Sequence, residues 1–196
     1  MMKKFLIVIM SCFVVFTSKG QDETVFIVNY LPAISLGKTA DFTNNFSPRG
    51  LDFEANKFLS EDLSVGFVVG WNIFREKISG ETFEYKDLTI TGTQFRYTNI
   101  IPINVNVKKY FSSGGDMLPY AGFGLGTNYA EQNNDIGVFT LSDNKWQFNI
   151  APEAGFLYHA GINAVLSFKL KYSYSPKAGD FPSTSYLCFG LGIGLD

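Results

Sequence analysis

The chain has 196 residues with 16 basic and 18 acidic side chains, so it carries no excess of positive charge for a nucleic-acid partner. Aromatic residues make up 16% of the chain, yet no apolar segment after the N-terminus approaches the roughly 20 residues that a spanning helix needs. Together these properties favour a membrane β-barrel, whose strands need only about 9 to 11 residues each and whose aromatic side chains gather at the membrane interfaces.

The N-terminal segment has the features of a secretory signal peptide. Two lysines precede a mainly apolar run from Phe5 to Phe16, and polar residues follow, with the small Ser18 and Gly20 at the positions that a signal peptidase prefers. We therefore predict that residues 1–20 are a cleaved signal peptide that directs secretion through the inner membrane. Residues 21–196 then form the mature domain.

The two cysteines indicate neither a disulfide nor a metal site. Residues 9–12 loosely match a lipoprotein box with Cys12 as the lipidated residue, but the apolar run continues past it, which favours the ordinary signal peptide. Cleavage after residue 20 leaves Cys188 as the only cysteine, so no intrachain disulfide is expected.

Strict alternation of side chains predicts the strands. Between residues 63 and 73 the odd positions are apolar, including Phe67 and Trp71, while the even positions are mostly small or polar, including Gly66 and Gly70. Seven further segments are expected to be strands: 23–32, 49–58, 94–108, 118–130, 146–158, 164–174 and 187–195. An even number of such strands predicts an all-β fold, an eight-stranded antiparallel up-and-down transmembrane β-barrel with its large apolar side chains facing lipid.

The connections between these strands alternate in length. Short turns are expected at 59–62, 111–117 and 159–163, and long polar loops at 33–48, 76–90, 131–145 and 176–184. Transmembrane barrels place short turns in the periplasm and long loops outside, so both chain ends should be periplasmic. The loops 33–48 and 76–90 are the largest expected exposed surfaces, and the sequence leaves open whether they bind a host molecule, a phage, a lipopolysaccharide or nothing specific.

Charged residues collect on the inward side of the predicted strands. We expect a lumen ion network formed by Asp52, Glu54, Arg96, Lys108, Glu153, Lys169 and Lys171. Charges inside a narrow barrel must be paired, and Glu153 lies on a strand next to that of Lys169 and Lys171, so an ion pair between these strands is expected. These charges predict a plug of salt bridges in a closed lumen, and the alternative is a polar pore for small solutes.

No catalytic, cofactor or metal site is predicted. The single histidine, His159, falls in a short periplasmic turn, away from the rim where an enzyme would act on lipid or protein. The glycines from Gly122 to Gly126 recur every second residue on a strand, unlike a phosphate-binding loop before a helix.

The segment from Leu118 to Gly126, with residues 104–111 before it, resembles the central hairpin of the small outer-membrane β-barrel family. This porin family of barrel domains includes OmpA-like and OmpX-like proteins of the Gram-negative cell envelope. The resemblance implies a location in the cell outer membrane, contact with outer-membrane lipid, and no catalytic residues. The abundance of Asn, Lys and Phe is typical of Bacteroidetes-type proteins.

The last strand carries the expected signal for the barrel assembly machinery, which the resemblance implies as a partner. Its outward residues are Leu187, Phe189, Leu191, Ile193 and Leu195. Family members typically end on an aromatic residue, whereas this chain ends on Asp196.

The sequence thus favours an integral outer-membrane barrel with a structural or surface-interaction role, a closed salt-bridged lumen and no catalysis. Three alternatives remain: a narrow porin, an outer-membrane enzyme that modifies lipid or protein, and a soluble barrel that binds an apolar ligand. A soluble barrel would place apolar groups inside, but here the charged Arg96 and Glu153 lie opposite the aromatic face.

Overall fold

The computed structural model describes residues 24–85, 88–111, 115–136, 139–160 and 164–195. Eight strands form a closed antiparallel ring in which each pairs with the next and the last pairs with the first. They are β1 (Thr24–Tyr30), β4 (Gly50–Ser60), β5 (Leu63–Tyr85), β6 (Leu88–Tyr110), β7 (Met117–Ile136), β8 (Phe139–His159), β9 (Ala164–Ser175) and β10 (Thr184–Leu195). Two short strands, β2 (Ala33–Leu36) and β3 (Phe46–Ser47), and the helix α2 (Gly37–Phe42) lie between β1 and β4. The predicted eight-stranded barrel is confirmed; the predicted signal peptide and Cys12 lie outside the described residues.

The alternation of side chains sorts the inside of the barrel from the outside. On β5, Phe67 and Trp71 point outward and are about half exposed, while Gly66, Gly70 and Asn72 point inward and are buried. The outward residues of β10 include Phe189, 43% exposed, and Ile193, 67% exposed. Large apolar groups thus cover the outer surface and polar groups fill the interior, the arrangement of a barrel in lipid.

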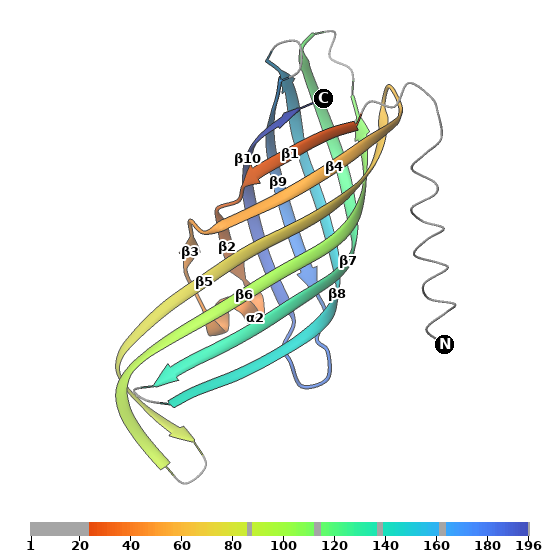
Figure 1. The fold of residues 1–196 in the computed structure, drawn as a ribbon. Helices are drawn as coiled ribbons and strands as arrows, with labels where there is room; N and C mark the ends of the chain where they lie inside the picture. The colour runs from red at the N-terminus through yellow and green to blue at the C-terminus, as the bar shows by residue number, and fades with distance from the viewer. Residues whose placement is uncertain (1–23, 86–87, 112–114, 137–138, 161–163, 196) are drawn as a thin grey trace.

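The two ends of the barrel differ. Both ends of the described chain and the short turns lie at one end, here called the turn end, since Phe26 pairs with Leu195 there. The opposite end carries the long hairpins and is here called the hairpin end (Figure 1). In the part of the chain that is described, no helix has the length and apolar character to cross a membrane.

The prediction of a loop over residues 33–48 is wrong. This connection continues the barrel wall. Tyr30 pairs with Leu191 and Ala33 pairs with Cys188, so β2 keeps the register of β1 along β10. Pro32 separates the two strands because it has no N–H to donate, although its carbonyl still accepts the N–H of Phe189 at 2.9 Å. The helix α2 then forms the tip of this hairpin.

The predictions of loops at 76–90 and 131–145 are also wrong, because the strands run on through most of these residues. β5 pairs with β6 as far as Tyr85 and Leu88, and β7 pairs with β8 as far as Ile136 and Phe139. These segments carry polar side chains on both faces. Such a composition suits a strand pair in water as well as a loop, so it did not distinguish the two structures. The remaining prediction, a loop over residues 176–184, matches the structure up to Ser183, where β10 begins.

These extensions make a sheet that projects beyond the barrel. β4 stops pairing with β5 at Asn72, and β9 pairs with β8 only from Ile150 toward the turn end. Beyond those residues the sheet consists only of β5, β6, β7 and β8, here called the projecting sheet (Figure 1). Near the ring its outer strands still make hydrogen bonds, from Asn45 to the Arg75 carbonyl on β5 and from Gln147 on β8 to the Pro176 carbonyl.

The barrel interior is layered along its axis. At the turn end an apolar cluster includes Val25, Tyr110, Tyr120 and Leu157. Toward the hairpin end a second apolar cluster is formed by Leu31, Ala33, Phe74, Ile100, Tyr186 and Cys188. Polar and charged side chains occupy the layer between them.

Candidate functional site

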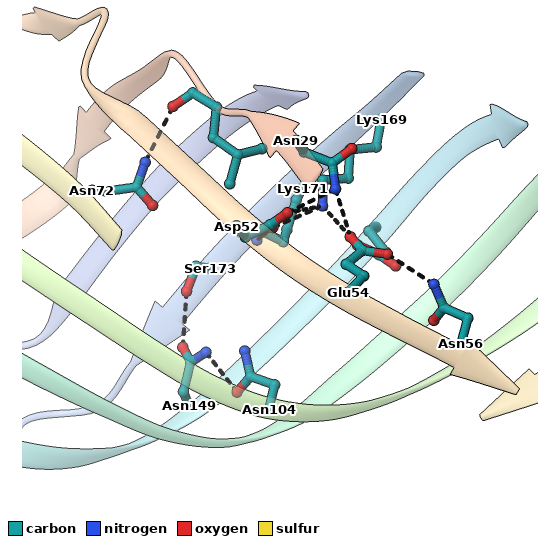
Figure 2. A network of polar contacts seen from close by, with 12 residues as sticks. Asn29, Asp52, Glu54, Asn56, Asn72, Asn104, Asn149, Lys169, Lys171 and Ser173 are labelled. Carbon is teal, nitrogen blue, oxygen red and sulfur yellow. Dashed lines mark hydrogen bonds and ion pairs between the residues drawn. The ribbon is translucent and has the colours of Figure 1, made fainter. Parts of the chain in front are cut away.

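Six of the seven charged residues predicted for the lumen lie together in this middle layer. β4 supplies two carboxylates, β8 supplies one, β6 supplies one lysine and β9 supplies two: Asp52, Glu54, Glu153, Lys108, Lys169 and Lys171. All six are at least 92% buried. We call this set the lumen network, and Figure 2 shows its β4 and β9 members in contact.

The strongest connection of the lumen network runs from β9 across the barrel to β4. The Lys169 ammonium lies 2.7 Å from one Asp52 oxygen and 3.0 Å from the other, and it also contacts a Glu54 oxygen. The Lys171 ammonium lies 2.7 Å from Asp52. Two lysines and two carboxylates therefore meet at one point in the lumen.

A second connection extends the lumen network to β6 and β8. The Lys108 ammonium lies 2.6 Å from Glu54 and 3.1 Å from Glu153. The predicted ion pair of Glu153 with Lys169 or Lys171 is wrong, although Glu153 and Lys171 are register partners on β8 and β9. Instead, Lys169 contacts both Asp52 and Glu54 on β4, and Lys171 contacts Asp52.

Glycines on the intervening strands make these long reaches sterically feasible. A Cβ added at Gly122 on β7 would stand 3.1 Å from both Glu153 and Lys108, so a larger residue would obstruct that ion pair. A Cβ at Gly190 on β10 would collide with the side chain of Lys169. The inward glycines are thus space left for charged side chains of neighbouring strands.

Two asparagines donate hydrogen bonds to carboxylates of the lumen network, and the sequence did not lead us to either of them. Asn29 donates to Asp52 at 2.7 Å and to Glu54 at 3.3 Å, and Asn56 donates to Glu54 at 3.1 Å. Their inward parity on β1 and β4 was the signal that could have identified them. Three carboxylates and three ammonium groups balance in charge, as burial in a low dielectric requires.

A neutral polar group lies next to the lumen network on the side of the hairpin end (Figure 2). Asn149 donates to Asn104 at 3.0 Å and accepts hydrogen bonds from Ser173 at 2.9 Å and Ser175 at 3.0 Å. These bonds link β6, β8 and β9 across the interior.

Arg96 is the exception among the predicted residues, and its assignment to the network is corrected. It lies twelve residues from Lys108 along β6, which is about 40 Å of extended strand, at the level of the projecting sheet. Its guanidinium instead stands over the ring of Phe42, 5.4 Å from the centroid. Parity alone gave the correct side of the strand but not the level along the barrel.

Helix α2 and the residue after it cover the lumen at the hairpin end. The Thr43 and Thr98 hydroxyls lie 3.0 Å apart, which ties the first hairpin to β6. The Thr39 hydroxyl accepts the N–H of Ser185 at 2.8 Å, which ties α2 to β10. Because these contacts join strands on different sides of the ring, the segment lies across the opening.

The turn end carries an exposed ion pair between Lys109 and Asp62. Hydrogen bonds from Lys109 and from Ser60 lower the pKa of Asp62 from its usual value. His159 also lies at this end, where its backbone N–H donates to the backbone carbonyl of Asp116 at 2.9 Å. Among the described residues no group of three or more His, Cys, Asp or Glu side chains is placed to hold a metal ion.

Comparison with known proteins gives relatives in structure only. No family model and no curated protein matches the chain. Neisserial surface protein A matches with a TM-score of 0.59 at 14% identity, covering 90% of this chain and 99% of that one. A major outer membrane protein from Thermus thermophilus matches with a TM-score of 0.57 at 14% identity, covering 88% of this chain and 99% of that one.

A third solved structure, the attachment invasion locus protein Ail of Yersinia pestis, matches with a TM-score of 0.54 at 14% identity. The match covers 90% of this chain and 99% of Ail. All three are small outer-membrane β-barrels. The chain therefore has the fold of the small outer-membrane β-barrel proteins, as its central hairpin indicated.

Proposed function

We propose that this chain is an integral outer-membrane protein with a structural or surface-interaction role and a lumen closed by ion pairs. The lumen network is the observation that carries this proposal. Its side chains come from β4, β6, β8 and β9 and meet inside the ring, so they occupy the path that a solute would take. An eight-stranded barrel has an interior only wide enough for side chains to fill.

The absence of catalysis is part of the proposal. The three buried carboxylates each contact a lysine inside the ring and are at least 92% buried, which keeps them away from a substrate at the cell surface. The single histidine lies at the turn end, away from the projecting sheet. These placements favour an architectural role for the interior.

Single-channel recording in planar bilayers tests the closed lumen. We expect the pure protein to show no large, long-lived conductance steps, because the ion pairs and α2 obstruct the barrel. A variant carrying both Glu54→Ser and Lys108→Ser should leak more, since it removes one pair of long side chains while keeping the charge balanced. Large steps from the unaltered protein would show a small-solute pore instead.

We assign the interaction role to the projecting sheet. Its strands have 20 to 23 residues, well beyond the roughly 9 to 11 that cross a membrane.

The pairing of the strands shows where each hairpin of the projecting sheet can be shortened so that the remaining strand ends still pair. Replacing residues 78–94 by Asn-Gly joins Lys77 to Phe95, which are paired, and replacing 132–143 joins Glu131 to Asn144 in the same way.

We expect each shortened protein to keep its barrel. Intact cells that carry it in the outer membrane are then tested for attachment to cultured host cells. Loss of attachment in either variant, with unchanged amounts in the outer membrane, supports the projecting sheet as the interaction surface. Attachment equal to the unaltered protein in both variants would restrict the role to the barrel itself.

A further inference from the structure

The outer face of the projecting sheet carries opposite charges in two parallel stripes. Arg75 and Lys77 form a basic stripe on β5, and both side chains are exposed. Glu131 and Asp135 form an acidic stripe on β7, where both are partly exposed. Residues two or four apart on a strand point to the same side, so each stripe belongs to one face of the sheet.

Two aromatic residues of β6 separate the stripes. Phe95 pairs with Lys77 on one side and with Asp135 on the other, so these three side chains stand in one row across the sheet. The Arg75 guanidinium lies 5.3 Å from the centroid of the Phe95 ring and 5.5 Å from that of Tyr97, and the Lys77 ammonium lies 5.8 Å from that of Phe95. The basic groups therefore lie over the rings, and the acidic stripe stands about 10 Å away at the backbone, two strand spacings across the sheet.

A face with this arrangement is complementary to a second copy of itself. Rotation by 180° about a line along β6 places the basic stripe of each copy over the acidic stripe of the other. Lys77 and Asp135 each lie one strand from Phe95, so both contacts form together. A partner of one charge sign would be attracted to one stripe and repelled by the other.

We propose that the projecting sheet binds a second copy of this chain face to face, with Lys77 of each copy against Asp135 of the other and the aromatic rings of β6 at the centre. Two sheets packed in this way have aligned strands about 10 Å apart, which long side chains bridge. A two-fold axis along β6 keeps both hairpin ends on the same side, so both barrels stand in one membrane. The proposal names the partner for the interaction role proposed above and rests on that role.

A cysteine near the axis detects this contact. Tyr97 lies on β6 at the centre of the interface, so Y97C proteins in phosphatidylcholine vesicles should be linked in pairs by a bismaleimide that bridges the roughly 10 Å between packed sheets. Ser142 is the matched control, because it lies in the same row as Tyr97 but two strands away on β8. Two S142C side chains would be about 20 Å apart across the dimer and should not be linked. The native Cys188 is buried in the lumen.

Charge reversal gives the dimer a signature that other contacts lack. In the Y97C protein, K77D and D135K should each lower cross-linking on the order of tenfold, because each replaces two attractive contacts by two repulsive ones. A mixture of the two variants should restore cross-linking between them, since each copy then carries the charges that the other needs. Tags of different length identify the mixed product on a gel. K177D, at an exposed lysine outside the projecting sheet, should leave cross-linking unchanged.

Three results would overturn the dimer. These are no linked pairs from inserted Y97C protein, equal cross-linking of Y97C and S142C, and a mixture of K77D and D135K that is linked no better than either variant alone. Loss of host-cell attachment in the shortened proteins, together with any of these results, would retain the interaction role and reject a second copy as its partner. Failure of the protein to insert into vesicles would contradict the membrane role itself.

Discussion

Glu54 occupies the centre of the lumen network, where single residues matter most. Its carboxylate contacts both Lys108 and Lys169 and also accepts a hydrogen bond from Asn56. Buried ion pairs add little net stability when both partners are present, but removing one partner leaves an uncompensated charge in a low dielectric. Residues of this kind therefore specify the arrangement of the interior more than they stabilise it.

Glu54→Ala should lower the free energy of unfolding by about 3 to 5 kcal/mol, because it leaves one buried lysine in excess. Urea titration of the protein in lipid vesicles, followed by tryptophan fluorescence, measures this. Asp62→Ala, which removes an exposed ion pair, is the matched control and should change stability little. A small effect of Glu54→Ala would mean that water reaches the network.

Phe67→Arg should lower the free energy of unfolding by roughly 2 to 4 kcal/mol, because it places a charge on the lipid face. Phe67 points outward and is 46% exposed. The control is Asn133→Arg, which lies on the projecting sheet. Equal tolerance at the two positions in the same unfolding assay would show that the outer face does not contact lipid.

At the scale of elements, the first hairpin does more than connect two strands. β2 and β3 continue the wall of the barrel. α2 lies between them and, with Thr43, contacts β10 and β6 across the opening. The turn into α2 is made by Gly37 at φ +50°, a left-handed conformation that other residues adopt at a cost. Gly37 therefore lets the chain enter α2 without the strain that a Cβ would bring.

Gly37→Ala should lower the free energy of unfolding by about 1 to 2 kcal/mol, the cost of a left-handed conformation with a Cβ. It should also speed amide hydrogen exchange in residues 37–43, because the added methyl would stand 3.1 Å from the Ser185 hydroxyl. Gly115→Ala is the control, since nothing lies within 4 Å of a Cβ there. Unchanged exchange at 37–43 would show that α2 does not hold the closure.

At the scale of the whole molecule, the apolar outer surface and the polar interior have a direct consequence for location. A barrel with this surface would aggregate in water, so the mature chain should be recovered from the detergent-extracted outer membrane. Cell fractionation with immunodetection measures this. Recovery in the soluble periplasm or the medium would favour a soluble barrel.

The sequence by itself located the eight strands of the ring, though not their full lengths, and the side of each that faces lipid. Alternation with a period of two is a local property, so Phe67 was assigned outside and Lys169 inside from neighbouring residues alone. The number of strands and the closed antiparallel ring followed, and the structural relatives share that fold.

Only the tertiary structure decided how the inward residues meet. Glu153 pairs with Lys108 over Gly122 rather than with the lysines of β9, and Arg96 lies at another level, because partners across a lumen depend on register and on empty space beside glycines. The continuation of β5 to β8 beyond the barrel and the inward fold of α2 also depend on pairing between distant segments. Alternation within one strand carries no information on such contacts.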